Sequence, residues 1–156
     1  MHKSAQYNLV YRQLAALLEG ETDPISKMAN TAAVLHETFG FWWTGFYRVV
    51  PCHSGLDPES AELVLGPFQG PVACMHIPFG RGVCGTAWKQ EESIVVPDVE
   101  AFPGHIACSS VSRSEIVIPV RDAGGEIVAV LDIDSDRPAA FDETDRLFLE
   151  KIVTLL

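Results

Sequence analysis

The stretch EIVIPVRDAGGEIVAVLDID, residues 115–134, indicates how this chain folds. Two runs rich in valine and isoleucine, 115–120 and 126–134, flank the turn sequence DAGG at 122–125. Such residues favour strands, and a short glycine-containing turn joins antiparallel strands. We therefore expect a β-hairpin here. Links of hairpin size elsewhere in the chain extend it to an antiparallel sheet.

Helices are expected before and after the strands along the chain. Apolar residues close to helical spacing predict a helix over about 5–19. Asp23 as N-cap and Pro24 at the first helical position predict a second helix, which ends at Gly40. Asp142 is expected to cap the last helix. The expected core residues are Leu9, Leu14, Leu17 and Leu18 in the first helix, Ile25, Met28, Ala29, Ala32 and Leu35 in the second, and Phe148, Leu149, Ile152 and Leu156 in the last.

The middle of the chain supplies the other strands and a short helix at 83–90. The further strands are expected at 41–50, 62–65, 72–77 and 93–96. Alternation along 41–50 places Trp43, Gly45 and Tyr47 on one face, where two aromatics beside a glycine leave room for a small ligand. The element order predicts one α+β domain over 1–156, an antiparallel sheet with helices on one face.

Composition excludes several classes of function. The 156 residues carry a net charge of −10, and their lysines and arginines are scattered. Nucleic acid and anionic membrane surfaces are therefore not expected as partners. The N-terminus lacks the pattern of a secretory signal, and no apolar run reaches membrane-spanning length. We expect a cytoplasmic protein, in which cysteines are more often catalytic, metal-binding or merely buried than in structural disulfides.

Three of the four cysteines, Cys74, Cys84 and Cys108, lie between residues 66 and 115. No two form a C-x-x-C pair, which excludes a thioredoxin-type dithiol. Cys108 falls in a long irregular connection, and long loops are often functional. Cys84 is expected at a helix start, where the helix dipole favours the thiolate. The stretch therefore predicts a thiol-based redox site, with inert buried cysteines as the alternative.

Two carboxylates in VLDID, Asp132 and Asp134, point to one face of their strand. Glu115 begins the neighbouring strand and is expected to join them. Like charges set side by side raise the pKa of at least one carboxyl group, so the cluster suits proton donation or a cationic ligand. A solvated edge strand is the alternative.

A zinc site is a competing interpretation of Cys74, His76, His105 and Cys108. These residues could supply four ligands, but the first pair lacks the knuckle spacing of zinc ligands. We expect no metal.

The motifs together resemble one family. The sequence contains W-x-G-F-Y at 43–47, L-x-L-G-P-F-Q-G at 63–70, A-C-x-x-I-P at 73–78, G-x-G-V-C-G-T-A at 80–87, G-H-I-A-C at 104–108 and S-E-I-V at 114–117. They resemble the free methionine-(R)-sulfoxide reductases, which are single GAF-domain enzymes. The resemblance covers nearly the whole chain. It implies a GAF-like sheet, with the terminal helices on one face and the ligand site under loops on the other.

The resemblance also implies roles for the cysteines. Cys108 matches the nucleophile that attacks the sulfoxide and becomes a sulfenic acid, and Cys74 the residue that resolves it as a disulfide. Cys84 matches a third cysteine that assists resolution or recycling. A thioredoxin is the expected external reductant, and no bound cofactor is needed.

Five further residues match the family's substrate site. Glu115, Asp132 and Asp134 correspond to the acids that engage the substrate and the sulfoxide oxygen. Trp43 and Tyr47 correspond to the aromatic wall that holds the methyl group.

Two features lie outside this assignment. The loop at 51–60 is longer than in the resembled family and adds Cys52, which we expect to be incidental. The alternative function is a ligand-sensing GAF module without chemistry. The sequence leaves the oligomeric state open, with a homodimer as one alternative.

Overall fold

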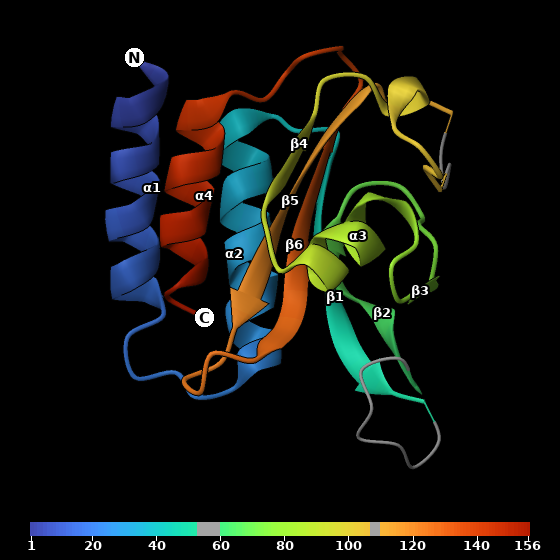
Figure 1. The fold of residues 1–156 in the computed structure, drawn as a ribbon. Coiled ribbons are helices and arrows are strands. Elements are labelled where there is room, and N and C mark those ends of the chain that lie inside the picture. Colours follow the sequence, from blue (N-terminus) through green and yellow to red (C-terminus); the bar gives the residue numbers. More distant parts are fainter. Residues whose placement is uncertain (53–59, 107–109) are drawn as a thin grey trace.

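The computed structural model describes residues 1–52, 60–106 and 110–156, and its centre is one six-stranded antiparallel sheet (Figure 1). The strands are β1 (Trp43–Pro51), β2 (Ala61–Gln69), β3 (His76–Pro78), β4 (Ile94–Val96), β5 (Ser114–Arg121) and β6 (Ile127–Ser135). They lie in the order β3-β2-β1-β6-β5-β4, and each neighbouring pair is antiparallel. The predicted hairpin is β5–β6.

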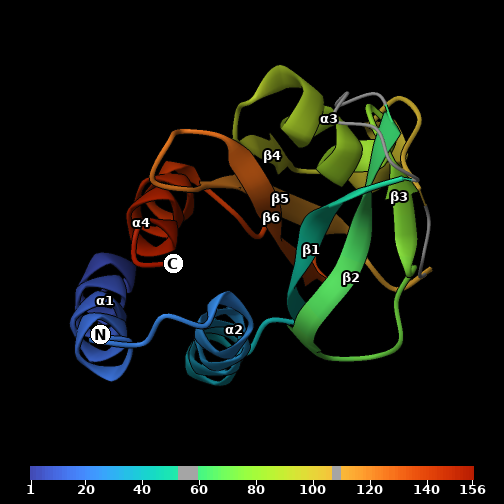
Figure 2. The same cartoon turned by 90° about the horizontal axis from the view of Figure 1, so that it is seen from below.

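Helices cover the two faces of the sheet unequally. They are α1 (Lys3–Leu17), α2 (Pro24–Phe39), α3 (Gly82–Gln90) and α4 (Glu143–Val153). The long helices α1, α2 and α4 lie together on one side, whereas α3 lies on the other with the connections around β3 and β4 (Figure 1, Figure 2). The α+β prediction is confirmed. Among the described residues, no helix has the length and apolar character to cross a membrane.

The ends of α2 follow the sequence signals. The carboxylate of Asp23 accepts hydrogen bonds from the backbone N–H groups of Ile25 and Ser26, at 2.8 and 3.1 Å. Gly40 adopts the left-handed conformation with φ of 65°, which glycine tolerates without a Cβ clash. Both predicted helix ends are confirmed.

The buried face of α1 differs from the prediction. Leu9 and Leu17 are 51% and 49% exposed, so their assignment to the core is wrong. Leu14 and Leu18 are buried as predicted. Tyr7 and Val10 are buried as well, and with Leu14 they occupy positions i, i+3 and i+7 of one helical face. The aromatic ring of Tyr7 lies outside the leucine pattern and packs against Phe39 and Phe148.

Two of the five core residues expected in α2 are also wrong. Ile25 and Ala29 are exposed, because they lie one turn apart at the edge of the helical face that Met28, Ala32 and Leu35 bury. Met28, Ala32 and Leu35 are buried as expected.

A polar clip joins α1 to α4. The hydroxyl of Tyr7 donates to Asp145 Oδ1 at 2.7 Å, and Lys3 Nζ lies 2.6 Å from Asp145 Oδ2. Asp145 is 1% exposed and also accepts from the backbone N–H of Asp142, which completes a capping box at the start of α4. The clip holds α1 against the body of the domain.

The strand expected at 72–77 is largely absent. β3 contains only His76–Pro78, and the side chains of Val72 and Met75 are 90% and 67% exposed. The carbonyl of Cys74 accepts a hydrogen bond from the Tyr47 hydroxyl rather than from a strand. The segment before β3 therefore follows the edge of a cavity instead of continuing the sheet.

The two faces of the sheet bury separate cores. Ile116, Leu131 and Ile133 belong to the core under the long helices, whereas Val117 and Val130 belong to the core under α3. Alternation along the strands makes this division. The second core surrounds the candidate site.

Candidate active site

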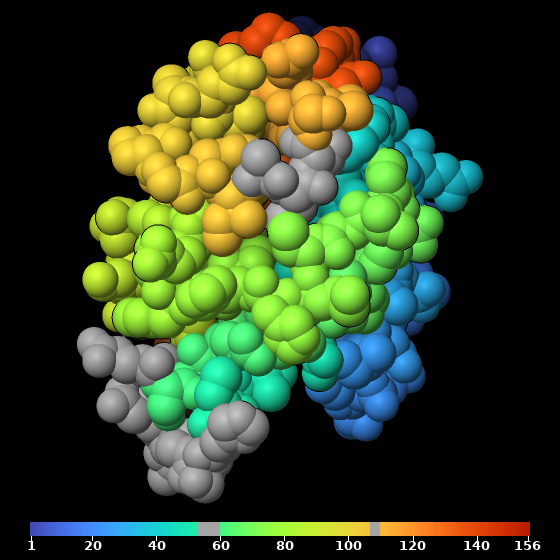
Figure 3. Space-filling model, turned by 90° about the vertical axis from the view of Figure 1, so that its right-hand side faces the viewer, coloured from blue at the N-terminus to red at the C-terminus, as the bar shows by residue number. Residues whose placement is uncertain are grey.

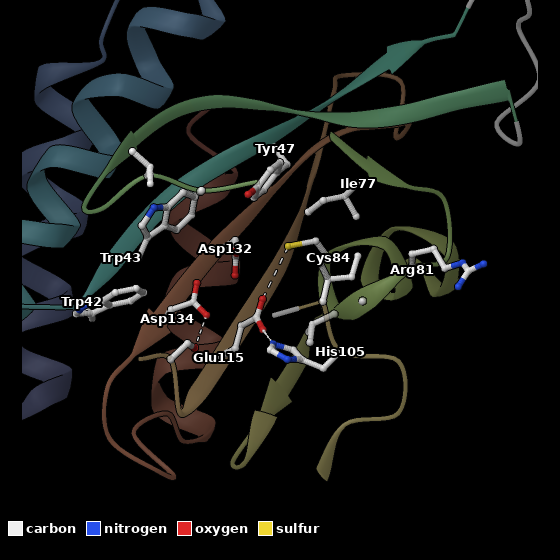
Figure 4. A pocket seen from close by; sticks show the side chains of 16 residues that line it. Trp42, Trp43, Tyr47, Ile77, Arg81, Cys84, His105, Glu115, Asp132 and Asp134 are labelled. Carbon is white, nitrogen blue, oxygen red and sulfur yellow. Dashed lines mark hydrogen bonds and ion pairs between the residues drawn. The ribbon is translucent and has the colours of Figure 1, made fainter. Parts of the chain in front are cut away.

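Three carboxylates converge on the α3 side of the sheet. Glu115 on β5 pairs in register with Asp134 on β6. Asp132 lies two residues before Asp134 on β6, so its side chain is on the same face of the sheet. Glu115 and Asp132 are 5% and 6% exposed. The three side chains point toward one space (Figure 4). The strand register therefore places three acids together, and the alternative of a solvated edge strand is wrong.

Burial of this cluster makes its carboxyl groups weak acids. Burial raises the pKa of Glu115 to about 8, with a further contribution from the charge of Asp134. The pKa values of Asp132 and Asp134 are raised well above their ordinary range, by burial first and by a neighbouring carboxylate second. Ser112 Oγ donates to Asp134 Oδ1 at 2.8 Å, which partly opposes the shift at that residue. At neutral pH the site holds protons that it can donate.

Cys84 faces the acids from the first turn of α3. Its Sγ lies 3.9 Å from Glu115 Oε1 and donates to it. The helix start is as predicted, but the expected thiolate is wrong. Burial, followed by the charges of Asp132 and Glu115, raises the pKa of this thiol well above its ordinary value.

An aromatic wall closes one side of the site. The ring centroids of Trp43 and Tyr47 are 6.0 Å apart, and both side chains lie on the site face as predicted. Trp43 Nε1 donates to the carbonyl of Pro71 at 3.0 Å, and the Tyr47 hydroxyl donates to the carbonyl of Cys74 at 2.9 Å. A Cβ on Gly45 would lie 2.5 Å from the Trp43 ring. The glycine therefore gives the indole room to lie across its strand.

His105 contacts the acid cluster, and sequence reasoning considered it only as a zinc ligand. Its Nε2 lies 3.5 Å from Glu115 Oε2, and its side chain is 15% exposed against 7% for Glu115. Partial burial lowers the pKa of His105. The position of His105 in the G-H-I-A-C motif indicated a role in the site. The motif did not indicate its partner Glu115, which is ten residues away on β5.

A cavity of about 60 Å³ lies between these groups. Cavity space of roughly 10–15 Å³ holds one water, so a small molecule fits here. Figure 3 shows this side of the molecule, where the segment after β2 (green) and the segment after the 3₁₀ turn Val99–Ala101 (yellow to orange) cover the sheet. Arg81 lines the cavity, but its guanidinium points away from the acids (Figure 4). The side chains that line it are those of Trp42, Trp43, Tyr47, Val72, Ala73, Ile77, Arg81, Val83, Cys84, His105, Ile106, Ser112, Glu115, Asp132 and Asp134.

Comparisons with known proteins agree with this geometry. The model of the GAF domain family matches residues 23–156. The structure of free methionine-R-sulfoxide reductase from Neisseria meningitidis, in complex with its substrate, is 52% identical, has a TM-score of 0.90, and matches 99% of this chain and 88% of that one. The Escherichia coli protein named free methionine-R-sulfoxide reductase is 42% identical over 157 residues, 100% of this chain and 89% of its own length.

The chain belongs to the free methionine-R-sulfoxide reductase family of GAF-domain proteins. The structure of a putative GAF sensor protein from Burkholderia vietnamiensis is also similar, at 41% identity and a TM-score of 0.88, with 99% of this chain and 93% of that one matched. The family resemblance expected from the sequence motifs is confirmed.

The cysteines of this reductase-family chain differ in state. Cys74 is disulfide-bonded, whereas Cys52 and Cys84 are free. Cys108, the expected nucleophile, lies outside the described residues.

The four zinc ligands considered from the sequence do not form one group among the described residues. His76 lies at the sheet edge, 2.9 Å from Glu62, while His105 contacts Glu115 in the cavity. The group of side chains that could hold a metal ion in the described part of the chain is a different one, Cys84, Glu115 and Asp132.

Proposed function

We propose that this protein reduces free L-methionine-(R)-sulfoxide to methionine with its own thiols and without a bound cofactor. The observation that carries the proposal is the cavity in which three buried carboxylates meet an aromatic wall. The relatives named free methionine-R-sulfoxide reductase, one of them solved with its substrate, support the same assignment.

The cavity suits a small zwitterionic sulfoxide. Asp132 and Asp134 are the proposed partners of the substrate's ammonium group, because a cation gains most where buried carboxylates lack a counter-charge. Trp43 and Tyr47 are the proposed wall for the methyl group. The small volume of the cavity, about 60 Å³, supports the free amino acid rather than a peptide as the proposed substrate.

Glu115 is the proposed acid for the first chemical step. The thiolate of Cys108 attacks the sulfoxide sulfur to form a transient S–S bond while Glu115 protonates the oxygen. The hydroxyl then passes to the sulfur of Cys108, and both the S–O bond of the sulfoxide and the transient S–S bond break. Methionine leaves and Cys108 becomes a sulfenic acid. The pKa of about 8 suits this task, since a carboxyl group that is protonated at neutral pH can donate.

The cycle closes in two further steps. The Cys74 thiol attacks the sulfenic sulfur, which releases water and forms a Cys74–Cys108 disulfide. A thioredoxin then reduces this disulfide by thiol exchange and becomes oxidised itself. Cys84 is proposed to assist resolution or recycling.

His105 is the proposed route by which Glu115 regains its proton. It touches Glu115 from the more exposed side of the site. Its lowered pKa leaves the imidazole mostly neutral at neutral pH, and a neutral imidazole passes a proton between its two nitrogens.

We also propose a cytoplasmic location, a single-domain organisation and a homodimer. The free thiols of Cys52 and Cys84 suit the cytoplasm, where a thioredoxin is available. Residues 1–156 are proposed to act as one domain, because α1 packs into the same core as α4. The exposed Leu9 and Leu17 of α1 support a homodimer, which light scattering after size-exclusion chromatography would test.

A ligand-sensing module without chemistry is the second candidate. The similar structure described as a putative GAF sensor favours it. A sensor would bind methionine sulfoxide or another small metabolite in the same cavity and leave it unchanged.

A single-turnover assay without reductant separates the two. Reduced protein is mixed with free methionine-(R)-sulfoxide, and methionine released per chain is counted. The reductase releases about one methionine per chain, with a Cys74–Cys108 bond detected by mass spectrometry. Cys74→Ser still releases about one methionine but does not recycle, and Cys108→Ser releases none. Bound sulfoxide with no methionine from the wild-type chain would refute the reductase.

A further inference from the structure

One group of side chains in the cavity has the composition of a metal site. Cys84 Sγ on α3, a carboxylate oxygen of Glu115 on β5 and one of Asp132 on β6 all lie within 4.8 Å of one another. Zinc binds sulfur at about 2.3 Å and oxygen at about 2.0–2.2 Å. At a tetrahedral angle, these bond lengths place a sulfur ligand and an oxygen ligand about 3.6 Å apart. Cys84 Sγ and Glu115 Oε1 are 3.9 Å apart, so a shift of a few tenths of an ångström completes this edge of a tetrahedron.

An independent feature, the unpartnered oxygen of Asp132, also points to a ligand. Asp132 Oδ1 is buried and has no hydrogen-bond partner, although the residue is only 6% exposed. The side chain projects into the space between the aromatic wall and Glu115 (Figure 4). A buried carboxylate oxygen without a partner is destabilising, so a bound cation or donor is expected there.

Among the described residues that line the cavity, Arg81 turns its guanidinium away from the three acids (Figure 4). Among the described residues, the ion pair made by these acids is the contact of Glu115 with His105. His105 Nε2, 3.5 Å from Glu115 Oε2, is therefore placed to act as a fourth ligand or to orient Glu115. Thiolate, imidazole and carboxylate together favour zinc, whereas magnesium and calcium prefer oxygen alone.

We propose that Zn²⁺ binds between Cys84, Glu115 and Asp132 and reversibly inhibits the protein by occupying the place of the substrate's ammonium group. Binding displaces to solvent the thiol proton of Cys84 and the protons held by the carboxyl groups of Glu115 and Asp132, and no oxidation or reduction occurs. The inhibitory half of this proposal rests on the proposed function, whereas the binding half does not.

The binding test uses a chain in which Cys84 is the remaining thiol, C52S/C74S/C108S. It is titrated with Cd²⁺, a spectroscopic substitute for Zn²⁺, and the ultraviolet thiolate-to-metal absorption is followed. The expected result is a band that saturates at one metal per chain and is displaced by Zn²⁺. Asp132→Asn should raise the Cd²⁺ dissociation constant at least about 10-fold, as loss of a metal-site group typically does.

Two controls keep the result interpretable. Adding Glu100→Gln removes an exposed acid outside the cavity and should leave the titration unchanged. Cys84→Ser and Cys84→Ala should each abolish the band, with circular dichroism showing that the fold is kept. No band at stoichiometric metal, or a band indifferent to Asp132→Asn in a folded chain, overturns the site.

Competition then tests the inhibition. Free methionine-(R)-sulfoxide should displace Cd²⁺ from the C52S/C74S/C108S variant, because both need Asp132. In the wild-type protein, Zn²⁺ should raise the KM for the sulfoxide without lowering kcat, and a chelator should reverse this. Cd²⁺ that stays bound at saturating sulfoxide overturns the shared site. If the wild-type chain shows no turnover at any metal concentration, the proposed reductase activity is refuted. If the Cd²⁺ band is still observed, the zinc site is retained.

Discussion

Replacing Glu115 with glutamine should stabilise the protein at alkaline pH while it removes the proposed acid. Glutamine keeps the shape of the side chain but carries no proton to lose. In the wild type, burial raises the pKa of Glu115 from its ordinary value of 4.5 to about 8. The folded state therefore binds this proton more tightly than the unfolded state. Its contribution to stability is fully present below pH 4.5, declines as pH rises, and is lost above pH 8.

The size of the effect follows from the same two values. At 1.36 kcal/mol for each pH unit, the difference between 4.5 and about 8 corresponds to about 5 kcal/mol. This is a ceiling, because Asp132 and Asp134 titrate in the same cluster and share the cost of charge. Above pH 8 the Glu115→Gln variant should therefore be the more stable protein, by up to this amount.

The assay is chemical denaturation with the thiols kept in one redox state. The pH runs from roughly 4 to 9, so that it includes both the ordinary pKa of Glu115, 4.5, and its pKa in the folded protein, about 8. Between pH 4.5 and 8 the unfolding free energy of the wild type should fall more steeply than that of the variant. Glu100→Gln, at an exposed position, is the matched control and should follow the wild type. Equal slopes for wild type and Glu115→Gln would refute the assignment of this titration. The variant should also release methionine more slowly in a single turnover.

Three further substitutions test separate parts of the structure. Gly45→Ala adds a Cβ that would lie 2.4 Å from the Cβ of Phe68, so we expect a loss of about 1–3 kcal/mol in denaturant unfolding and a higher KM from the displaced aromatic wall. Tyr7→Phe removes a hydrogen bond to the buried carboxylate of Asp145 and should cost about 1.5–3 kcal/mol in the same assay, with KM unchanged. His105→Gln should lower kcat with little change in KM, and added imidazole should restore part of the rate if His105 supplies protons. An unchanged kcat across the pH range would remove it from the proton route.

The sheet and its acids were readable from the sequence because they depend on local periodicity. The alternation in VLDID placed Asp132 and Asp134 on one face, and the hairpin register brought Glu115 beside them. The aromatic pair on β1 followed from the same period of two. The caps of α2 were predicted correctly because a cap depends on a few adjacent residues.

What the sequence missed depends on contacts between distant segments. The buried face of α1 includes Tyr7, whose hydroxyl donates to Asp145 of α4, a contact that no local pattern contains. The segment at 72–75 has residues typical of strands, but the hydroxyl of Tyr47 on β1 donates a hydrogen bond to the carbonyl of Cys74. The high pKa of Cys84 likewise arises from carboxylates on two other elements. Local rules predicted the elements, and side-chain chemistry across elements determined the exceptions.

The two cores on opposite faces of the sheet also matter for redesign of the molecule. A strand residue such as Ile116 faces the helices, while its neighbours Glu115 and Val117 face the site. Substitutions on the two faces share few direct contacts, so their effects on unfolding should be close to additive. An engineer can therefore improve heat tolerance under the long helices and alter ligand preference under α3 as two independent projects on one scaffold.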